Sequence, residues 1–514
     1  MQFDMSEIIK KVEFRYKCAI VTAFVVGLIS QGMGLFNKFS VHDDPINYGV
    51  GATYTSGRWM LDVLANWEVK FYGDGHYSLP AFNGFLAILL IAISACLIIK
   101  IIEIKSPVLC CFIAATMVSF PVITSIFGYM FTLHFYMMSL LLGISGAYCI
   151  CMSNKWYVWC LGVILMGASV GIYQAFVPVT ITVILFYLID YVKKQDNEQL
   201  IIKKVVLAGC CCVLFMIFYF LASKFYLSSH DAVLSDYKGI DSMGKSSIGE
   251  YLNRAIDGYK EFFFPDMDAN YYMYPGNILL VYRIILFISI ILSIIILVDL
   301  FKKSVFRGIV FTFLVAMIPL SVNFIFVMAG RAEVHSLMVY SQLMPYVFFA
   351  WILENFKIER KLIAKGVSFV SAILIASVLL MYLRVDNKCY LKATYAQQEA
   401  ISYFTSLVSS IKNVDGYKDD YLIAFVNERS ISDTSLQSGD NGIMQNIGYV
   451  PYNLNVNGYV NNYTWISFMR QWTGYTPTVV DASPFSEMDE VKEMPSYPDD
   501  GSIVIINDTV VVKF

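Results

Sequence analysis

The sequence predicts a mainly α-helical, polytopic membrane protein with about eleven transmembrane helices, followed by a C-terminal extracytoplasmic α/β domain. First, 57% of the 514 residues are hydrophobic and 15% are charged, whereas about a quarter of the residues in soluble proteins are charged. Second, eleven apolar runs approach the length of about 20 residues that a spanning helix needs. Third, lysine and arginine recur in every second loop between these runs. The net charge of −3 is close to neutral, so no nucleic-acid partner is expected.

The predicted spans share a high apolar content and few charges in their interiors. They cover residues 18–36, 84–102, 107–128, 130–152, 156–172, 175–191, 205–226, 277–298, 308–328, 336–353 and 362–383. The fifth and sixth of these runs are short for a span.

The basic residues predict the orientation. Four of them precede the first span, and the excess returns in alternate loops up to the loop before the last span. Because cytoplasmic loops carry an excess of Lys and Arg, we expect a cytoplasmic N-terminus. Eleven crossings then place residues 384–514 outside.

The chain is expected to divide into two domains. Residues 1–383 form the multi-span membrane domain, with long outer loops at 37–83 and 227–276. Residues 384–514 form the outer α/β domain. Its predicted elements are a helix at 391–412, strands at 421–426, 502–506 and 509–514, and a turn at Asn507-Asp508.

An acidic pair directly follows the first span, in the segment Val41-His42-Asp43-Asp44-Pro45. Mutual repulsion and desolvation raise the pKa of one of two adjacent carboxyl groups, which suits a general base. Pro45 favours an extended chain beside Asp44. The alternative is a solvated loop that Pro45 terminates. A divalent metal held by His42, Asp43 and Asp44 is a further, less favoured possibility.

Residues 55–71 of the first outer loop predict an amphipathic helix lying in the membrane interface. Apolar residues recur at helical spacing, and Trp59 and Trp67 suit the headgroup level. Arg58 and Asp62 lie four residues apart on another face.

Two further arginines on the outer side are candidates for phosphate binding. Arg331 is a cation in an outer loop, against the general charge bias, and His335 follows it. A guanidinium offers paired donors that match a phosphate. Pairing of Arg331 with Glu333 is the alternative. Arg283, at the start of the eighth span, is another candidate.

Tyr173 and Gln174 lie at the predicted outer turn between the fifth and sixth spans. Their polar groups could hydrogen-bond a sugar, or could satisfy the backbone groups at the ends of the two helices.

The order of these motifs resembles the bacterial Gtr type II glucosyltransferases. The acidic pair comes first, then Tyr48-Gly49 with Ser56-Gly57-Arg58-Trp59, then Tyr173-Gln174-Ala175, all on one predicted side. The resemblance covers most of the membrane region, and the C-terminal domain matches least. It implies a GT-C-like glycosyltransferase in the bacterial cytoplasmic (inner) membrane. Such enzymes place an acidic residue of the first outer loop at the catalytic centre and use a polyprenyl-phosphate sugar.

The resemblance further implies transfer of glucose to a cell-surface polysaccharide, as in O-antigen modification, with no cofactor required. In an inverting displacement, Asp44 or Asp43 would take the proton of the acceptor hydroxyl. Arg331, with Arg58 or His335, would stabilise the departing lipid phosphate, so a metal is not required. The C-terminal domain is expected to position the acceptor.

Two other functions fit the same sequence features. A transporter or flippase of lipid-linked saccharides also has many spans and basic outer pockets, but it would bury charges near the bilayer midplane. A polysaccharide polymerase or ligase also works outside on polyprenyl-linked sugars, with a pyrophosphate-linked donor.

Overall fold

The structure is a computed structural model of the whole chain. It describes residues 12–40, 44, 53–73, 75, 77–235, 246–265, 277–329, 334, 336–356, 361–427 and 465–514. The chain forms two compact units. The membrane unit comprises Met1–Lys38, Tyr48–Lys388 and Gly448–Tyr452. The C-terminal unit comprises Cys389–Ile447, Asn453–Phe514 and the acidic segment Phe39–Asn47.

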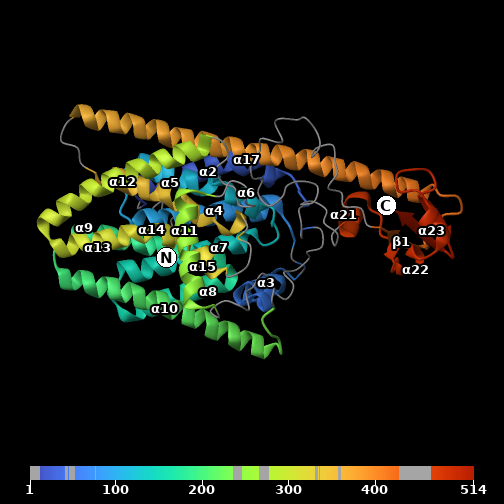
Figure 1. Cartoon of the computed structure of the whole chain (residues 1–514), viewed down its shortest axis with the longest axis horizontal. Helices are drawn as coiled ribbons and strands as arrows, with labels where there is room; N and C mark the ends of the chain where they lie inside the picture. Colours follow the sequence, from blue (N-terminus) through green and yellow to red (C-terminus); the bar gives the residue numbers. More distant parts are fainter. Residues whose placement is uncertain are drawn as a thin grey trace, which may run out of the picture. The chain divides into compact units, whose positions relative to one another are not determined.

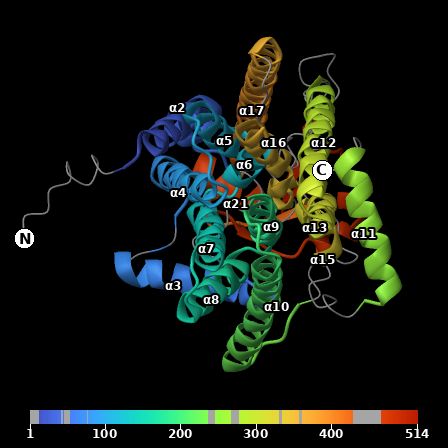
Figure 2. The same cartoon turned by 90° about the vertical axis from the view of Figure 1, so that its left-hand side faces the viewer.

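The membrane unit is built from helices (Figures 1 and 2). They are α2 (Phe14–Phe36), α3 (Trp59–Tyr72), α4 (Pro80–Ile101), α5 (Pro107–Ser119), α6 (Pro121–Phe127), α7 (Leu133–Met152), α8 (Trp156–Ile172), α9 (Val177–Lys194), α10 (Glu198–Ser229), α11 (Ile248–Phe263), α12 (Asn277–Lys303), α13 (Val305–Ala316), α14 (Ile318–Val322), α15 (Phe324–Met328), α16 (Met344–Asn355) and the first part of α17 (Lys361–Lys412). Several begin with proline at the first or second position, where its missing N–H costs nothing.

Neighbouring helices along the chain pack into a continuous layer. α2 contacts α4 and α5, α4 contacts α7, and α7 contacts α8, which in turn contacts α10. Helix α3 packs against α8 and α10. The helix predicted at 55–71 is therefore present, and it begins at Trp59 after a short 3-10 helix, Thr53–Ser56.

Eight helices in the described part of the chain are long and apolar enough to cross a membrane, or nine if the bent pair α5 and α6 forms one span. The predicted count of eleven is not confirmed. α8 has only 17 residues and α16 only 12. The run predicted at 308–328 is broken at Met317 and Asn323 into α13, α14 and α15, although Val305–Val322 still counts among the eight. Hydropathy counts apolar residues whether or not one continuous helix contains them.

The C-terminal unit holds the end of α17 and a four-stranded sheet of order β2-β1-β4-β3. The strands are β1 (Leu422–Val426), β2 (Thr478–Val479), β3 (Ile503–Ile506) and β4 (Thr509–Lys513). β1 pairs in parallel with β2 and β4, whereas β3 and β4 form an antiparallel hairpin. The sequence predicted three of these strands and the hairpin turn, whose residues Asn507 and Asp508 have φ values of +48° and +58°. The short helices α21 (Trp465–Thr473), α22 (Ser483–Ser486) and α23 (Asp489–Glu493) also belong to this unit.

Candidate functional site

The turn before α3 is built around Gly57. This residue has φ +76°, a left-handed conformation that glycine adopts without a steric penalty. A Cβ atom here would lie 2.5 Å from the Tyr219 hydroxyl and 3.0 Å from Gln174 Nε2. The backbone at Gly57 therefore lies close to α10 and to the turn after α8. Arg58 follows directly, at the residue before α3 begins.

Arg58 is held against two stacked tyrosines. Its guanidinium carbon lies 5.5 Å from the centre of the Tyr173 ring, which is within the range of a cation–π contact. Its Nη1 donates to the Tyr136 hydroxyl over 3.4 Å. The rings of Tyr136 and Tyr173 are stacked with centroids 4.3 Å apart. Because both rings are buried, Arg58 has a defined position while its side chain stays only half-buried.

Gln174 links the same turn to α10. Its amide nitrogen donates to the carbonyl of Ser56 over 3.2 Å and to the Tyr219 hydroxyl over 3.3 Å. The Tyr219 hydroxyl donates in turn to the carbonyl of Gly57 over 3.2 Å. At the end of α8, a Cβ on Gly171 would lie 2.7 Å from the Trp59 indole, so only glycine permits this approach.

A third segment reaches this cluster through Tyr173. The ring is 2% exposed, and its hydroxyl donates to the carbonyl of Leu337 over 3.1 Å. Two motifs singled out in the sequence, Ser56–Trp59 and Tyr173–Ala175, are thus brought together, and the 3-10 helix η5 (Ser336–Met338) contacts them through Leu337. The contacts fit the alternative in which Tyr173 and Gln174 hold the surrounding backbone. Their role as sugar ligands stays a prediction.

The remaining candidate residues are distributed differently. Asp44 is 4% exposed and belongs to the C-terminal unit. Arg283 is exposed on the first turns of α12. Four candidates lie outside the described residues, namely His42, Asp43, Arg331 and His335.

No group of three or more His, Cys, Asp or Glu side chains that could hold a metal ion occurs within the described ranges. Two of the possible metal ligands, His42 and Asp43, lie outside those ranges.

Sequence reasoning missed Tyr136, Tyr219 and Asp386. The two tyrosines occur within apolar runs and no spacing marks them. Asp386 lies three residues after the predicted end of the last span, and it is fully buried in the membrane unit. Ser30 and Thr124 both donate to its carboxylate. An ionisable residue so close to the last apolar run is the sequence feature that could have identified Asp386.

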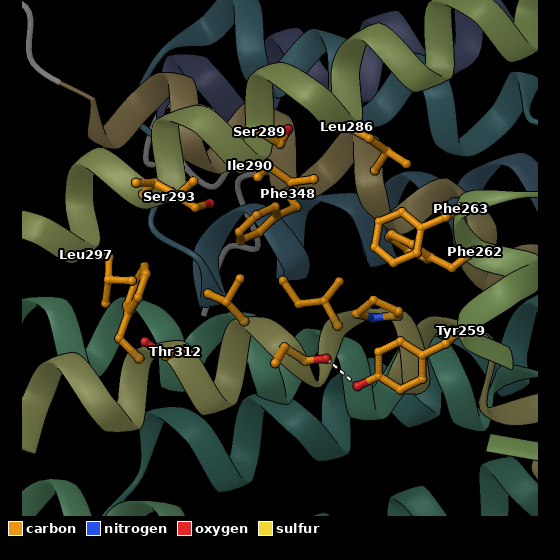
Figure 3. Close-up of a pocket in the computed structure, with 16 residues that line it drawn as sticks. Tyr259, Phe262, Phe263, Leu286, Ser289, Ile290, Ser293, Leu297, Thr312 and Phe348 are labelled. Atoms are coloured by element: carbon orange, nitrogen blue, oxygen red, sulfur yellow. Dashed lines mark hydrogen bonds between the residues drawn. The ribbon is translucent and has the colours of Figure 1, made fainter. Parts of the chain in front are cut away.

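An apolar groove lies between α11, α12, α13 and α16 (Figure 3). Its volume is about 410 Å³, within the range of small-molecule sites. Nearly all of its lining is hydrocarbon, with Phe262 and Phe263 at one end and Leu297 at the other. The hydroxyls of Ser289 and Ser293 are buried in this wall, with no hydrogen-bond partner among the described residues. The groove follows α12 from Leu286 to Leu297, about 16 Å at the rise of an α-helix.

The family model described as glucosyl transferase GtrII matches residues 32–346. This stretch is more than half of the chain. It contains the Arg58 turn, the Tyr173–Gln174 turn and the helices of the apolar groove up to the start of α16. No match was found among curated proteins or among solved structures.

Proposed function

Because the chain belongs to the glucosyl transferase GtrII family, we propose that it transfers glucose from a polyprenyl-phosphate donor to a cell-surface polysaccharide or related glycan. The proposed reaction takes place on the outer face of the bacterial cytoplasmic membrane. The family match carries this proposal. The long apolar helices support the membrane location, since a lipid-linked donor is accessible only to an enzyme in the same bilayer.

The proposed reaction is a single inverting displacement. Asp44, or its neighbour Asp43, accepts the proton of the acceptor hydroxyl as that oxygen attacks the anomeric carbon of the donor. The bond between this carbon and the phosphate oxygen breaks, and the electron pair leaves with the lipid phosphate. Arg331, with Arg58 and His335, stabilises the charge that grows on the phosphate. This chemistry needs no nucleotide or other cofactor, and the cations take the place of a metal.

The apolar groove supports a lipid-linked donor. A polyprenyl chain is a hydrocarbon that needs a long, unbranched apolar channel, and the groove along α12 has this character. Arg283 precedes Leu286 by about one helical turn on the same helix. In the predicted orientation it lies on the outer side of the groove, where the phosphate of a bound carrier would be.

The geometry at Arg58 supports a role in binding the donor phosphate. A guanidinium held against a buried aromatic ring and hydrogen-bonded to a second one loses little conformational freedom when it binds an anion. The stacked tyrosines and the Gly57 turn hold Arg58 in this way before any ligand arrives.

The decisive experiment uses the purified full chain in nanodiscs with polyprenyl-phosphate [14C]glucose and candidate acceptor glycans. We expect label in the glycan, an inverted anomeric linkage, and release of polyprenyl phosphate. Inclusion of a nucleotide-linked glucose in place of the lipid donor should give no product. Lipid donor that stays intact with every acceptor would contradict the proposal.

One observation favours a second candidate function. Asp386 is a buried carboxylate among membrane-unit helices, with Ser30 and Thr124 as hydrogen-bond donors. Transporters carry such ionisable groups within the bilayer. Reconstitution in liposomes separates the two functions, because a flippase moves labelled lipid-linked sugar between leaflets without cleaving it.

A further inference from the structure

In the sequence, residues 48–388 of the membrane unit separate the acidic segment, Phe39–Asn47, from the rest of the C-terminal unit. The segment nevertheless packs as a part of the C-terminal unit. Asp44 is almost fully buried there. Burial of a carboxyl group is costly unless its surroundings compensate for it, so the position of Asp44 depends on what holds this segment.

Ser40 holds the segment in place, and we call it the anchor of the segment. It is completely buried, and three side chains of the C-terminal unit contact it. Its backbone N–H donates to Gln397 Oε1 over 3.1 Å. Its hydroxyl donates to Gln471 Oε1 over 2.5 Å and accepts a hydrogen bond from Trp472 Nε1 over 3.0 Å. The backbone N–H of Ser40 thus has a partner on α17, and its hydroxyl has two partners on α21.

The residue before Ser40 is held as well. The ring of Phe39 stacks on Tyr390 of α17, with centroids 5.8 Å apart. Asp44 is four positions after Ser40, and an extended chain spans at most about 3.5 Å per residue. Asp44 must therefore lie within about 14 Å of this anchor.

We propose that Gln397, Gln471 and Trp472 are positioning residues, through which the C-terminal unit sets the place of the proposed base Asp44. The inference rests on the proposed function for the role of Asp44. It gives the C-terminal unit a task in the chemical step, in addition to the acceptor binding expected from the sequence. Loss of a contact to Ser40 then lowers turnover without lowering donor affinity, because the base acts on the acceptor hydroxyl.

The test compares two conservative variants of the C-terminal unit. Trp472→Phe removes the hydrogen bond to Ser40. Tyr475→Phe is the matched control, since it removes a hydrogen bond of 3.2 Å to Tyr417 elsewhere in the same unit. Hydrogen exchange is measured on the peptide that contains Ser40 and Asp44, in the full chain. We expect faster exchange in Trp472→Phe and unchanged exchange in Tyr475→Phe. Equal exchange in both variants would overturn the proposal, whatever the activities are.

Kinetics then show whether the effect acts through the carboxylate. We expect Trp472→Phe to lower kcat about fivefold, the size of one lost hydrogen bond of about 1 kcal/mol, with KM for the donor unchanged. In an Asp44→Asn background the same substitution should have no further effect, because coupled residues are not additive. If Trp472→Phe lowered kcat by the same factor in the Asp44→Asn background as in the wild type, the positioning role would be contradicted. Faster exchange in Trp472→Phe together with full activity of Asp44→Asn and Asp43→Asn would reject the proposed base and leave the anchor intact.

Discussion

Gly57→Ala is the sharpest perturbation of the Arg58 cluster. Gly57 has φ +76°, and an added Cβ would lie 2.5 Å from the Tyr219 hydroxyl. Gly73, at the other end of α3, also has φ +76°, but nothing lies within 4 Å of its Cβ position. Gly73→Ala is therefore a matched control, which introduces the same backbone strain without a collision.

The magnitude follows from the contacts. A left-handed conformation costs a residue with a Cβ about 1–2 kcal/mol, and both variants carry this cost. In Gly57→Ala the Tyr219 side chain must also move. This breaks its hydrogen bonds to the Gly57 carbonyl and from Gln174, each worth about 1 kcal/mol. Gly57→Ala is thus expected to cost about 2 kcal/mol more than Gly73→Ala. If this cost adds to the activation free energy of transfer, the rate falls about 30-fold.

The assay is glucosyl transfer by purified protein in nanodiscs, with elution from a sizing column and thermal inactivation as controls for folding. We expect Gly57→Ala to be about 30-fold slower than Gly73→Ala at a temperature where both stay folded. Tyr219→Phe removes the same two hydrogen bonds without an added Cβ, so it should slow transfer by a similar factor, and adding it to Gly57→Ala should slow transfer little further, because the lost interactions are shared. Equal rates for the two glycine variants, or independent, multiplying effects of Gly57→Ala and Tyr219→Phe, would refute the role of this turn.

Four other predictions concern the proposed base, the donor phosphate, the groove and the topology. Asp44→Asn should cut turnover by about 10²–10⁴-fold with donor affinity retained, and near wild-type turnover in both Asp44→Asn and Asp43→Asn would remove the acidic pair from the mechanism. Arg331→Ala should weaken donor affinity and turnover together, since the phosphate is charged in the ground state and gains charge in the transition state; an effect on neither would exclude phosphate binding. Ile294→Trp should fill the apolar groove and raise KM for a long-chain polyprenyl donor but not for a short-chain analogue, and an equal effect on both donors would separate the groove from the lipid. A phosphatase reporter fused after residue 514 should be active and a cytoplasmic reporter silent, and the reverse pattern would place the C-terminal unit inside the cell.

The candidate site was only partly predictable. The sequence marked Arg58, Tyr173 and Gln174, and the structure brings all three into one cluster. It gave no indication that Tyr136 and Tyr219 complete this cluster. A tyrosine in an apolar run has the same local pattern whether it faces a lipid, a helix or an arginine.

The sequence by itself determined that the chain is a membrane protein rich in helices. It also determined the positions of most apolar segments and the motifs that resemble the family. These properties are local, because the free energy of moving a helix into lipid is close to a sum over its own residues. It also located three of the four described C-terminal strands, because short apolar runs bounded by turn residues are local signals.

Only the tertiary structure decided which distant residues meet. It joined Gly57 to Tyr219 on α10, and Ser40 to Trp472 at the far end of the chain. It also showed which apolar runs break into shorter helices, as at Met317 and Asn323. The physical reason is that a hydrogen bond or a ring contact depends on positions and directions in space. The local sequence around each of two distant residues does not show that they will be in contact. They meet only after the helices between them have packed.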